Sequence, residues 1–597
     1  MSRFSTLLFV LPMVASCADS EPSVTPPPPW GVPISGGTML VTRDGLHAVI
    51  ADPDRDRLVS VELATGKIVA DTPLQVNDEP GRLVEDGTGL VHVALRRGNA
   101  IVSYDAATGT LGARRAACAE PRGLAWDPAS DQLHVACSTG ELVSFPAAGG
   151  EATRRLRLDR DLRDVVISNG QLVVTRFRTA EVLTLDAQGA VASRVVPPTV
   201  RRINSRGFEG GPVEPDDDGR IDAIPAVAYR TLALADGRIL VTHQRQLQKE
   251  LGTEETGGYG GFGCGANPVE AAVTIVAGGV PHSVKPVFIG TLPVDAAVSP
   301  RGDRVAFVSA GTRTIHQVGI AAFGEDRGED DQDCPGGGGD DVAPLINDQL
   351  GAPTSVAYAP DGALVVFYPE LPGIVIRSAV GDVRTVTLPG EIGYDAGRAL
   401  FNAATPVGLA CASCHPEARE DGLVWNFRDI GTRRTQSLAG GILGRGPYHW
   451  AGDMADLPTL MDDVFAKRMA GGPITNSQRL SLGPWLDRLP VPAAAPLADA
   501  AAVDRGRALF QSDATQCATC HTGVLMTNNV RVNVGTLGTF KVPSLLGVSA
   551  RAPFMHDGCA STLADRFGSC GGGDLHGRTS QLDATQLADL VAYLESL

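Results

Sequence analysis

A unit of alternating strands recurs between residues 34 and 390, and it limits the fold more than any other feature of the chain. Residues 58–66 (LVSVELATG) and 101–109 (IVSYDAATG) are alternating segments that each end in an A-T-G turn. A second recurring element consists of two strands joined by a tight turn, as in residues 294–308 (VDAAVSPRGDRVAFV). Seven such units begin near residues 38, 78, 120, 162, 225, 292 and 352. A period of about 40 residues with about four strands per unit predicts an all-β, seven-bladed propeller over residues 34–390.

Two insertions interrupt the repeat. Residues 247–285 are rich in glycine and contain Cys264, whereas residues 322–345 are acidic, rich in glycine and contain Cys334. The acidic cluster at 329–331 could bind calcium, but we interpret it as a solvated loop. Histidines are scattered through the repeat without ligand spacing, so we expect them to be ordinary strand or loop residues. They are His47, His92, His134, His243, His282 and His316.

Downstream of the repeat, a cysteine motif occurs twice, as CASCH at 411–415 and CATCH at 517–521. C-x-x-C-H is the attachment sequence of a c-type haem, in which both thiols bond the macrocycle edge and the histidine binds the iron. A redox dithiol or a zinc site is the alternative, but zinc needs four ligands at suitable spacing. We therefore predict two covalently attached haems c. The residues that would bind them are Cys411, Cys414, His415, Cys517, Cys520 and His521.

The two motifs lie in a tandem repeat. Residues 395–401 (DAGRALF) precede the first motif and residues 504–510 (DRGRALF) precede the second, and both are typical of short helices with buried Leu and Phe. The Ala- and Pro-rich stretch 490–502 separates the two units. We therefore predict that two mainly α-helical cytochrome c-type domains, at residues 391–490 and 491–597, follow the propeller.

Four further phrases carry a family resemblance. They are R-x-T-x-S-L at 433–438, P-Y-H-W-A-G at 447–452, F-K-V-P-S-L-L-G-V at 540–548 and A-P-F-M-H-D-G at 552–558. From about residue 390 onward the chain resembles the di-haem cytochrome c peroxidase/MauG family, and its repeat resembles the YVTN/NHL-like propellers of exported bacterial proteins. The resemblance implies a pair of communicating haems in an exported bacterial protein.

Two residues are candidates for the second axial ligand of each iron. Met469 lies 20 residues after His449, and His576 lies 20 residues after His556. Because equal offsets in matched repeats indicate equivalent roles, we predict that Met469 binds the first iron and His576 the second. A core methionine and a surface histidine are the alternatives. His449 and His556 are alternative ligands, although the family's equivalent of His556 sits beside the haem without being its usual ligand.

The chain departs from the peroxidase pattern at two places. In the family's second unit a methionine normally follows the A-P-Y-x-H-D-G motif, whereas this chain has Cys570 near that place. The acid–base carboxylate of the family cannot be placed, because Glu417, Glu420 and Asp421 lie near the first motif but are expected to be solvated. No catalytic residue is therefore assigned.

The N-terminus has the layout of an export signal. Arg3 supplies a positive charge, a short apolar run follows, and residues 14–17 (VASC) are typical of a bacterial lipobox. This pattern predicts a signal peptide at 1–17, lipid attachment to Cys17 and a Pro-rich tether at 18–33. An ordinary secretory signal with a chance cysteine is the alternative. The apolar run is shorter than a bilayer requires, so we expect membrane contact through the lipid anchor only.

The remaining cysteines agree with export. Removing Cys17 and the four motif cysteines from the total of 11 leaves six, which favours three disulfides in an exported protein. Fifteen connectivities exist, and nearest-neighbour pairing is our choice. The pairs would be Cys118–Cys137, Cys264–Cys334 and Cys559–Cys570. We expect the bacterial cell envelope, facing the periplasm or the outer surface.

These observations predict an exported di-haem c-type cytochrome that transfers electrons. Its redox partner would be a small cytochrome, a cupredoxin or a quinone-linked chain. A net charge of -17 without a basic patch argues against a nucleic-acid partner. One alternative is a peroxidase- or MauG-like oxidoreductase that reduces hydrogen peroxide. The other is a propeller that binds a partner and carries the haems as accessories.

Overall fold

The computed structural model describes residues 31–203, 220–254, 256–260, 267–284, 289–323, 350–494, 496 and 499–597. The predicted signal peptide with Cys17, most of the tether, and the pair Cys264–Cys334 lie outside the described residues. No helix in the described ranges combines the length and the apolar character needed to cross a membrane.

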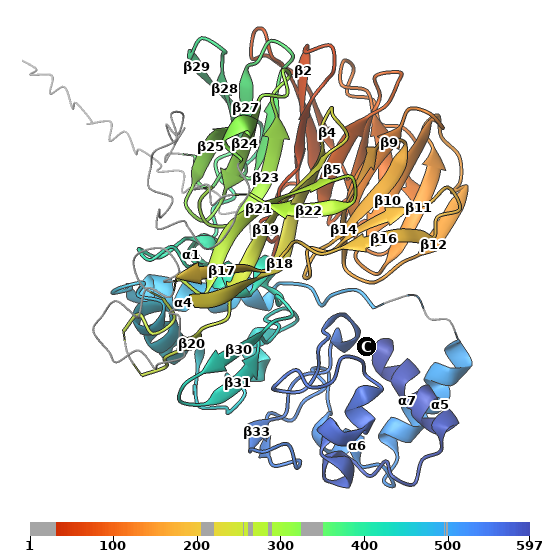
Figure 1. The fold of residues 1–597 in the computed structure, drawn as a ribbon, viewed down its shortest axis with the longest axis vertical. Helices are drawn as coiled ribbons and strands as arrows, with labels where there is room; N and C mark the ends of the chain where they lie inside the picture. The colour runs from red at the N-terminus through yellow and green to blue at the C-terminus, as the bar shows by residue number, and fades with distance from the viewer. Residues whose placement is uncertain are drawn as a thin grey trace, which may run out of the picture.

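In the described part of the chain, seven antiparallel sheets follow one another along the sequence and form a ring (Figure 1). We call them blades 1 to 7. Blade 1 contains β1 (Met39–Val41), β2 (His47–Asp52), β3 (Arg57–Glu62) and β4 (Ile68–Pro73). Blade 2 contains β5 (Pro80–Glu85), β6 (Val91–Leu95), β7 (Ala100–Tyr104) and β8 (Arg115–Ala116). Blade 3 contains β9 (Pro121–Asp127), β10 (Gln132–Cys137), β11 (Glu141–Pro146) and β12 (Arg154–Arg157).

The other four blades vary more in strand number. Blade 4 contains β13 (Leu162–Ser168), β14 (Gln171–Arg176), β15 (Val182–Leu185) and β16 (Val191–Val195). Blade 5 contains β17 (Val200–Ile203), β18 (Arg220–Ala233), β19 (Ile239–Leu247), β21 (Val269–Ala277) and β22 (Val280–Ser283). Blade 6 contains β23 (Pro293–Val298), β24 (Arg304–Ser309) and β25 (Thr314–Gly319). Blade 7 contains β26 (Ser355–Tyr358), β27 (Leu364–Tyr368), β28 (Gly373–Arg377) and β29 (Val383–Thr387).

The predicted propeller is confirmed, and local chemistry explains its turns. The A-T-G turns end at Gly66 and Gly109, whose φ angles of 76° and 75° are in the left-handed region that favours glycine. The innermost strands of neighbouring blades lie side by side around the axis. Blade 1 meets blade 7 where the Thr38 backbone N–H donates to Ser355 Oγ at 2.8 Å. Apolar residues of both blades, such as Ile50 and Phe367, share one buried cluster that closes the ring.

Blade 5 reaches beyond the ring. β18 is 14 residues long, and its first residues pair with β17 below the propeller in Figure 1. Just after β19, the short strand β20 (Glu250–Leu251) pairs in parallel with β30 (Val424–Phe427) of the C-terminal region. The propeller and the C-terminal region are therefore joined by backbone hydrogen bonds.

The expectation of two mainly α-helical cytochrome c-type domains is wrong. Among the described C-terminal residues, three helices reach 12 residues, namely α4 (Asn476–Asp487), α5 (Ala500–Gln511) and α7 (Ala584–Glu595). The other elements are α1 (Ala396–Asn402), α2 (Cys411–Cys414), β30, β31 (Gly431–Arg434), α3 (Leu457–Leu460), the π-helix Met461–Arg468, α6 (Cys517–Cys520), β32 (Arg531–Val532), β33 (Phe540–Lys541) and several 3-10 turns. Glycine- and proline-rich stretches such as 440–447 and 471–473 interrupt helix formation, so loops wrap most of this region.

Pairs of helices cross in each half of the C-terminal region. We call residues 391–490 the first segment and residues 491–597 the second segment. In the first, α1 packs on α4, and the Phe401 and Trp485 rings lie 5.2 Å apart. In the second, α5 packs on α7 so closely that a Cβ at Gly506 would overlap the backbone of Asp589. Glycine at this position lets the two helix backbones approach each other.

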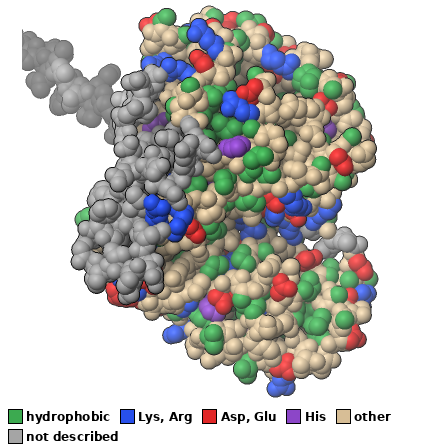
Figure 2. Space-filling model, in the orientation of Figure 1, with side chains coloured by type: hydrophobic (Ala, Val, Ile, Leu, Met, Phe, Trp, Pro, Cys, Tyr) green, Lys and Arg blue, Asp and Glu red, His purple; other side chains and the backbone are tan. Residues whose placement is uncertain are grey.

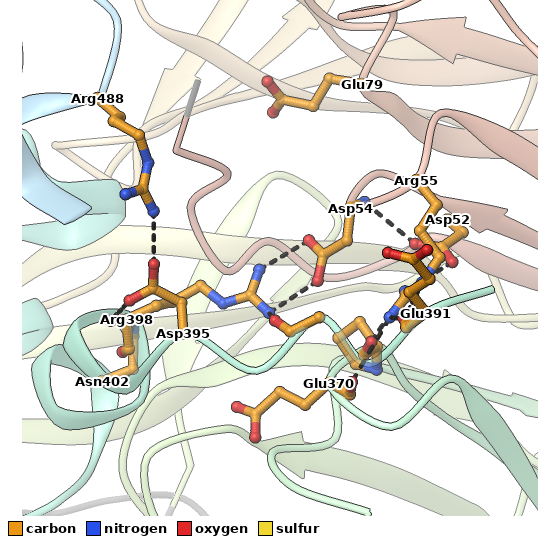
Figure 3. A network of polar contacts seen from close by, with 12 residues as sticks. Asp52, Asp54, Arg55, Glu79, Glu370, Glu391, Asp395, Arg398, Asn402 and Arg488 are labelled. Atoms are coloured by element: carbon orange, nitrogen blue, oxygen red, sulfur yellow. Dashed lines mark hydrogen bonds and ion pairs between the residues drawn. The ribbon is translucent and has the colours of Figure 1, made fainter. Parts of the chain in front are cut away.

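A buried ionic network fastens α1 to blade 1 (Figure 3). Arg398 of α1 donates two hydrogen bonds of 2.7 Å to the carboxylate of Asp54, in the turn between β2 and β3. Both side chains are at least nine-tenths buried. Burial alone would lower the pKa of Arg398, but the charge of Asp54 raises it well above the ordinary value. In the same view Asp395, the N-cap of α1, binds Arg488 at 2.5 Å.

Two of the three predicted disulfides are present, Cys118–Cys137 and Cys559–Cys570. The first lies within blade 3 and the second in the second segment. On the face shown in Figure 2, acidic and basic side chains are interspersed over the propeller and over the lobe below it.

Candidate cofactor sites at the two CxxCH motifs

Each cysteine motif forms a single helical turn beside its own cavity. α2 ends at His415, and the cavity next to it, about 280 Å³ in volume, is lined by Cys411, Cys414 and His415. α6 ends at His521, and a cavity of about 210 Å³ is lined by the corresponding three residues of the second motif. All four motif cysteines are free thiols. Each motif therefore presents two thiols and one imidazole to one cavity.

The two motif histidines are held in the same way. Nδ1 of His415 donates to the carbonyl oxygen of Arg419 at 3.3 Å, and Nδ1 of His521 donates to that of Met526 at 3.3 Å. A carbonyl can only accept, so these contacts favour the Nδ1–H tautomer, in which Nε2 keeps its lone pair. Burial lowers the pKa of both imidazoles, that of His521 to about 4, and so keeps them neutral. A neutral imidazole in this tautomer is a competent metal ligand.

The donor set does not resemble a site for a bare metal ion. Within the residues that the structure describes, no group of three or more His, Cys, Asp or Glu side chains is arranged to hold one. Burial raises the pKa of the Cys411 thiol to about 12, which disfavours the thiolate that zinc requires. One imidazole beside two protonated thiols, at the rim of a largely apolar cavity, fits an iron carried in a macrocycle.

His576 lines the second cavity together with His521. The two ring centroids are 6.4 Å apart and the ring planes are inclined by 38°. Nδ1 of His576 donates to the carbonyl oxygen of Gly571 at 3.1 Å, which again leaves Nε2 unprotonated. Burial lowers the pKa of His576 to about 3, so this imidazole is also neutral. The structure thus brings together the two histidines that the sequence paired.

Met469 lines the first cavity together with His415. It is 6% exposed and packs in a small apolar cluster with Val407, Leu409 and Cys411. This placement agrees with both interpretations of Met469, as a ligand of the first iron and as a core methionine, because the residue is buried and lies beside the motif. His449 lines the same cavity, and its Nδ1 is 3.5 Å from Asp453 Oδ2.

The alignment that produced the equal offsets was wrong by one residue. His449 has a φ of 67° and Met555 has a φ of 70°, and each follows the first residue of a matching backbone bridge. The counterpart of His449 is therefore Met555, and the counterpart of His556 is Trp450. Counted from these counterparts, Met469 lies 20 residues after His449 and His576 lies 21 residues after Met555, so the two offsets differ by one. The shift is visible in the sequence, because residues 447–452 (PYHWAG) and 553–558 (PFMHDG) align without a gap and place His449 opposite Met555.

The two cavities share a wall. Arg434, Trp450, Lys541 and Arg551 line both of them. The indole N–H of Trp450 donates to the backbone oxygen of Arg434 at 2.7 Å, which fixes the ring. The Trp450 centroid is 6.3 Å from that of His556. The His556 ring in turn stacks on the ring of Phe540 in β33, and the two centroids are 4.1 Å apart.

The shared wall carries an excess of buried positive charge. Burial lowers the pKa of Arg434 to about 10, of Arg445 to about 10 and of Lys541 to about 8. Glu420 pairs with Arg434 at 2.5 Å and with Arg551 at 3.4 Å. The Nε atoms of Arg434 and Arg445 are buried without a hydrogen-bond acceptor among the described residues. Buried cations need anions, and the carboxylates of a haem are of the kind that this cluster would bind.

The expectation that Glu417, Glu420 and Asp421 are solvated is wrong. Their exposed fractions are 8%, 3% and 1%. Glu417 binds Arg163 at 2.6 Å and Arg122 at 3.1 Å, and both arginines come from innermost strands of the propeller. Burial would raise the pKa of Glu417, but the charges of Arg122 and Arg163 lower it well below its ordinary value. The arginines lie far away in the sequence, so a local pattern could not place them.

Sequence reasoning missed these propeller arginines, although a signal was present. Arg122 and Arg163 are each the second residue of an innermost strand, at matching positions of two repeats, and Arg82 is the third residue of another innermost strand. Arginine at an otherwise apolar, axis-facing position is costly unless an acid meets it there. Aligning the blades by these arginines would have indicated a polar axis.

Comparisons with known proteins are limited in extent. No protein-family profile matches this chain. Over 71 residues, which are 12% of this chain and 20% of the relative, it is 37% identical to the hydrazine synthase subunit gamma of Kuenenia stuttgartiensis. A solved chain of hydrazine synthase from the same organism aligns with a TM-score of 0.46 at 17% identity, covering 59% of this chain and 97% of that one. A streptogramin B lyase aligns with a TM-score of 0.36 at 11% identity, covering 57% and 91%.

Proposed function

We propose that this chain holds two covalently attached haems c and transfers electrons through them. The observation that carries the proposal is the pair of histidines that line one cavity beside two free thiols. The ring centroids of His521 and His576 are 6.4 Å apart. Both imidazoles would hold the iron of the second haem.

Each residue type at the two sites has a defined task. The thiols Cys411, Cys414, Cys517 and Cys520 would form the covalent links, and His415 and His521 would be the first axial ligands. When bound, each haem c would supply a one-electron redox centre. The carbonyls of Arg419 and Met526 orient the imidazoles. The basic side chains of the shared wall would hold the haem carboxylates.

The shared wall supports electron transfer between the two sites. Trp450 is common to both cavities, and its hydrogen bond to Arg434 fixes the ring there. Closing both axial positions of the second iron, with His521 and His576, would favour electron transfer over binding of a substrate. Met469 would close the first iron in the same way.

Location and partners follow as parts of the same proposal. We infer an exported protein, anchored by lipid at Cys17, that exchanges electrons with a small cytochrome, a cupredoxin or a quinone-linked chain. Two disulfides support an oxidising compartment. The 71-residue identity to a subunit of hydrazine synthase supports a role in redox chemistry.

The test is haem content and spectroscopy of the full chain produced in a host that attaches haem c. Wild type should carry two haems, and replacing either Cys411/Cys414 or Cys517/Cys520 with alanine should leave one. The double variant Cys559→Ala/Cys570→Ala removes two cysteines outside the motifs and should keep both haems. Low-spin spectra that do not change with peroxide support electron transfer. A half-reduced protein that develops a high-spin signal and consumes peroxide would instead support the peroxidase alternative.

A further inference from the structure

The loop after the first motif is clamped by the propeller, whereas the loop after the second is not. Residues 416–421 are mostly buried at the end of the propeller axis. In the second segment, Thr522, Gly523 and Val524 are exposed, and Val524 is 91% exposed. Because the two motifs are otherwise built alike, this difference sets the first histidine apart.

Two residues of the loop, Glu417 and Arg419, form the clamp through ion pairs with the propeller. Glu417 reaches Arg163 of β13 at 2.6 Å and Arg122 of β9 at 3.1 Å. Arg419 binds Glu120 with two hydrogen bonds, of 2.8 Å and 3.0 Å. The contact of Arg419 with Glu120 has the bidentate geometry that fixes a guanidinium in one orientation. Acid and base thus alternate between the loop and the propeller.

The clamp leads directly to the imidazole. Arg419, whose side chain binds the propeller, also offers the carbonyl oxygen that accepts the Nδ1–H of His415. Glu417 and Ala418 lie between these two residues with φ angles of 53° and 56°. This left-handed conformation is unfavourable for non-glycine residues, so the ionic contacts must hold the loop in its shape. The propeller therefore determines where the Nδ1 acceptor of His415 lies.

We propose that the propeller positions the axial histidine of the first haem, through the contacts of Glu417 with Arg163 and of Arg419 with Glu120. Glu417, Arg163 and Arg419 are positioning residues, since they act through His415. The inference rests on the proposed haem attachment and adds that the two haems differ in control, because the propeller positions the histidine of the first haem and not that of the second. A change at the propeller axis would then affect the first iron more than the second.

The test uses the full chain with Glu417→Gln and Arg163→Gln. These variants break the same contact but change the charge in opposite directions. If positioning is the effect, both should alter the low-spin EPR signature of the first haem in the same way and shift its reduction equilibrium in the same direction by threefold or more, about 28 mV at 59 mV per tenfold. Arg419→Lys, which keeps the charge and loses the bidentate fork, should give a smaller change of the same kind.

The controls separate this inference from the proposed function. The variant that lacks Cys517 and Cys520 assigns the signals of the first haem, and Arg57→Gln, which breaks an ion pair with Asp71 on the outer strands of blade 1, should change nothing. Opposite shifts with unchanged EPR signatures would show a charge effect alone and overturn the inference, as would equal effects on both haems. A wild-type protein without haem would overturn the proposed function instead.

Discussion

Removing the guanidinium of Arg398 should loosen the first segment from the propeller. The substitution Arg398→Ala would leave Asp54, which is nine-tenths buried, without its two hydrogen bonds of 2.7 Å. Glu370, which is 3% exposed, would also lose a nearby positive charge, and burial already raises its pKa. Breaking a buried ion pair from one side costs about 3–5 kcal/mol, and we expect a loss of this size.

The repeat supplies a matched control for this substitution. Arg507 occupies the same position in DRGRALF, but its side chain is 51% exposed and pairs with an Asp504 that is 71% exposed. Arg507→Ala should therefore cost about 1 kcal/mol or less. A chain with several folding units does not unfold in one step, so the proper measurement is native-state hydrogen exchange of α1 and α5.

A double-mutant cycle decides whether the pair itself is responsible. Arg398→Ala and Asp54→Ala should each be costly, and the double variant should cost about 3 kcal/mol less than their sum, because no charge is then left unpaired. Strictly additive costs, or equal losses from Arg398→Ala and Arg507→Ala, would refute the reasoning. The first result would mean that the two side chains do not interact, and the second that the position matters and the ion pair does not.

Three further outcomes are expected. His576→Ala should abolish the low-spin signal of the second haem, whereas alanine at the exposed His282 should not; an unchanged signal would exclude His576 as a ligand. In the haem-free protein, burial lowers the pKa of Lys541 from 10.5 to about 8. Between these two pH values the unfolded chain binds more protons than the folded chain, so the free energy of unfolding should rise with pH. The urea midpoint should rise with it, and an equally steep rise in Lys541→Met would contradict this reasoning. Gly506→Ala should separate α5 from α7 at a cost of about 1–3 kcal/mol, seen as faster hydrogen exchange in α7, and normal protection there would refute the close approach.

The sequence predicted those parts of the molecule that local patterns determine. Alternating strands and their glycine turns indicated the propeller, and nearest-neighbour pairing of cysteines indicated two disulfides that the structure contains. The sequence did not predict contacts between residues that lie far apart in the chain. Glu417 is polar and lies after a proline, so it looked solvated until Arg122 and Arg163 met it from blades 3 and 4. The helical content was overestimated because the two cysteine motifs and the short helices at 395–401 and 504–510 were taken to indicate helical cytochrome c-type domains, whereas glycine- and proline-rich segments such as 440–447 form loops instead.

The burial of the Glu417 loop bears on the order in which the protein is assembled. For a haem to be attached, the haem and any enzyme that attaches it must reach both thiols of a motif. At the first motif, Ala412 and Ser413 are 2% exposed and the following loop is locked against the propeller, whereas at the second motif Thr519 and Thr522 are at the surface. Under the proposed haem attachment, the first site would be filled before the C-terminal region docks, while the second would stay open to late maturation. A chain that folds too early would carry a haem at Cys517 and Cys520 only.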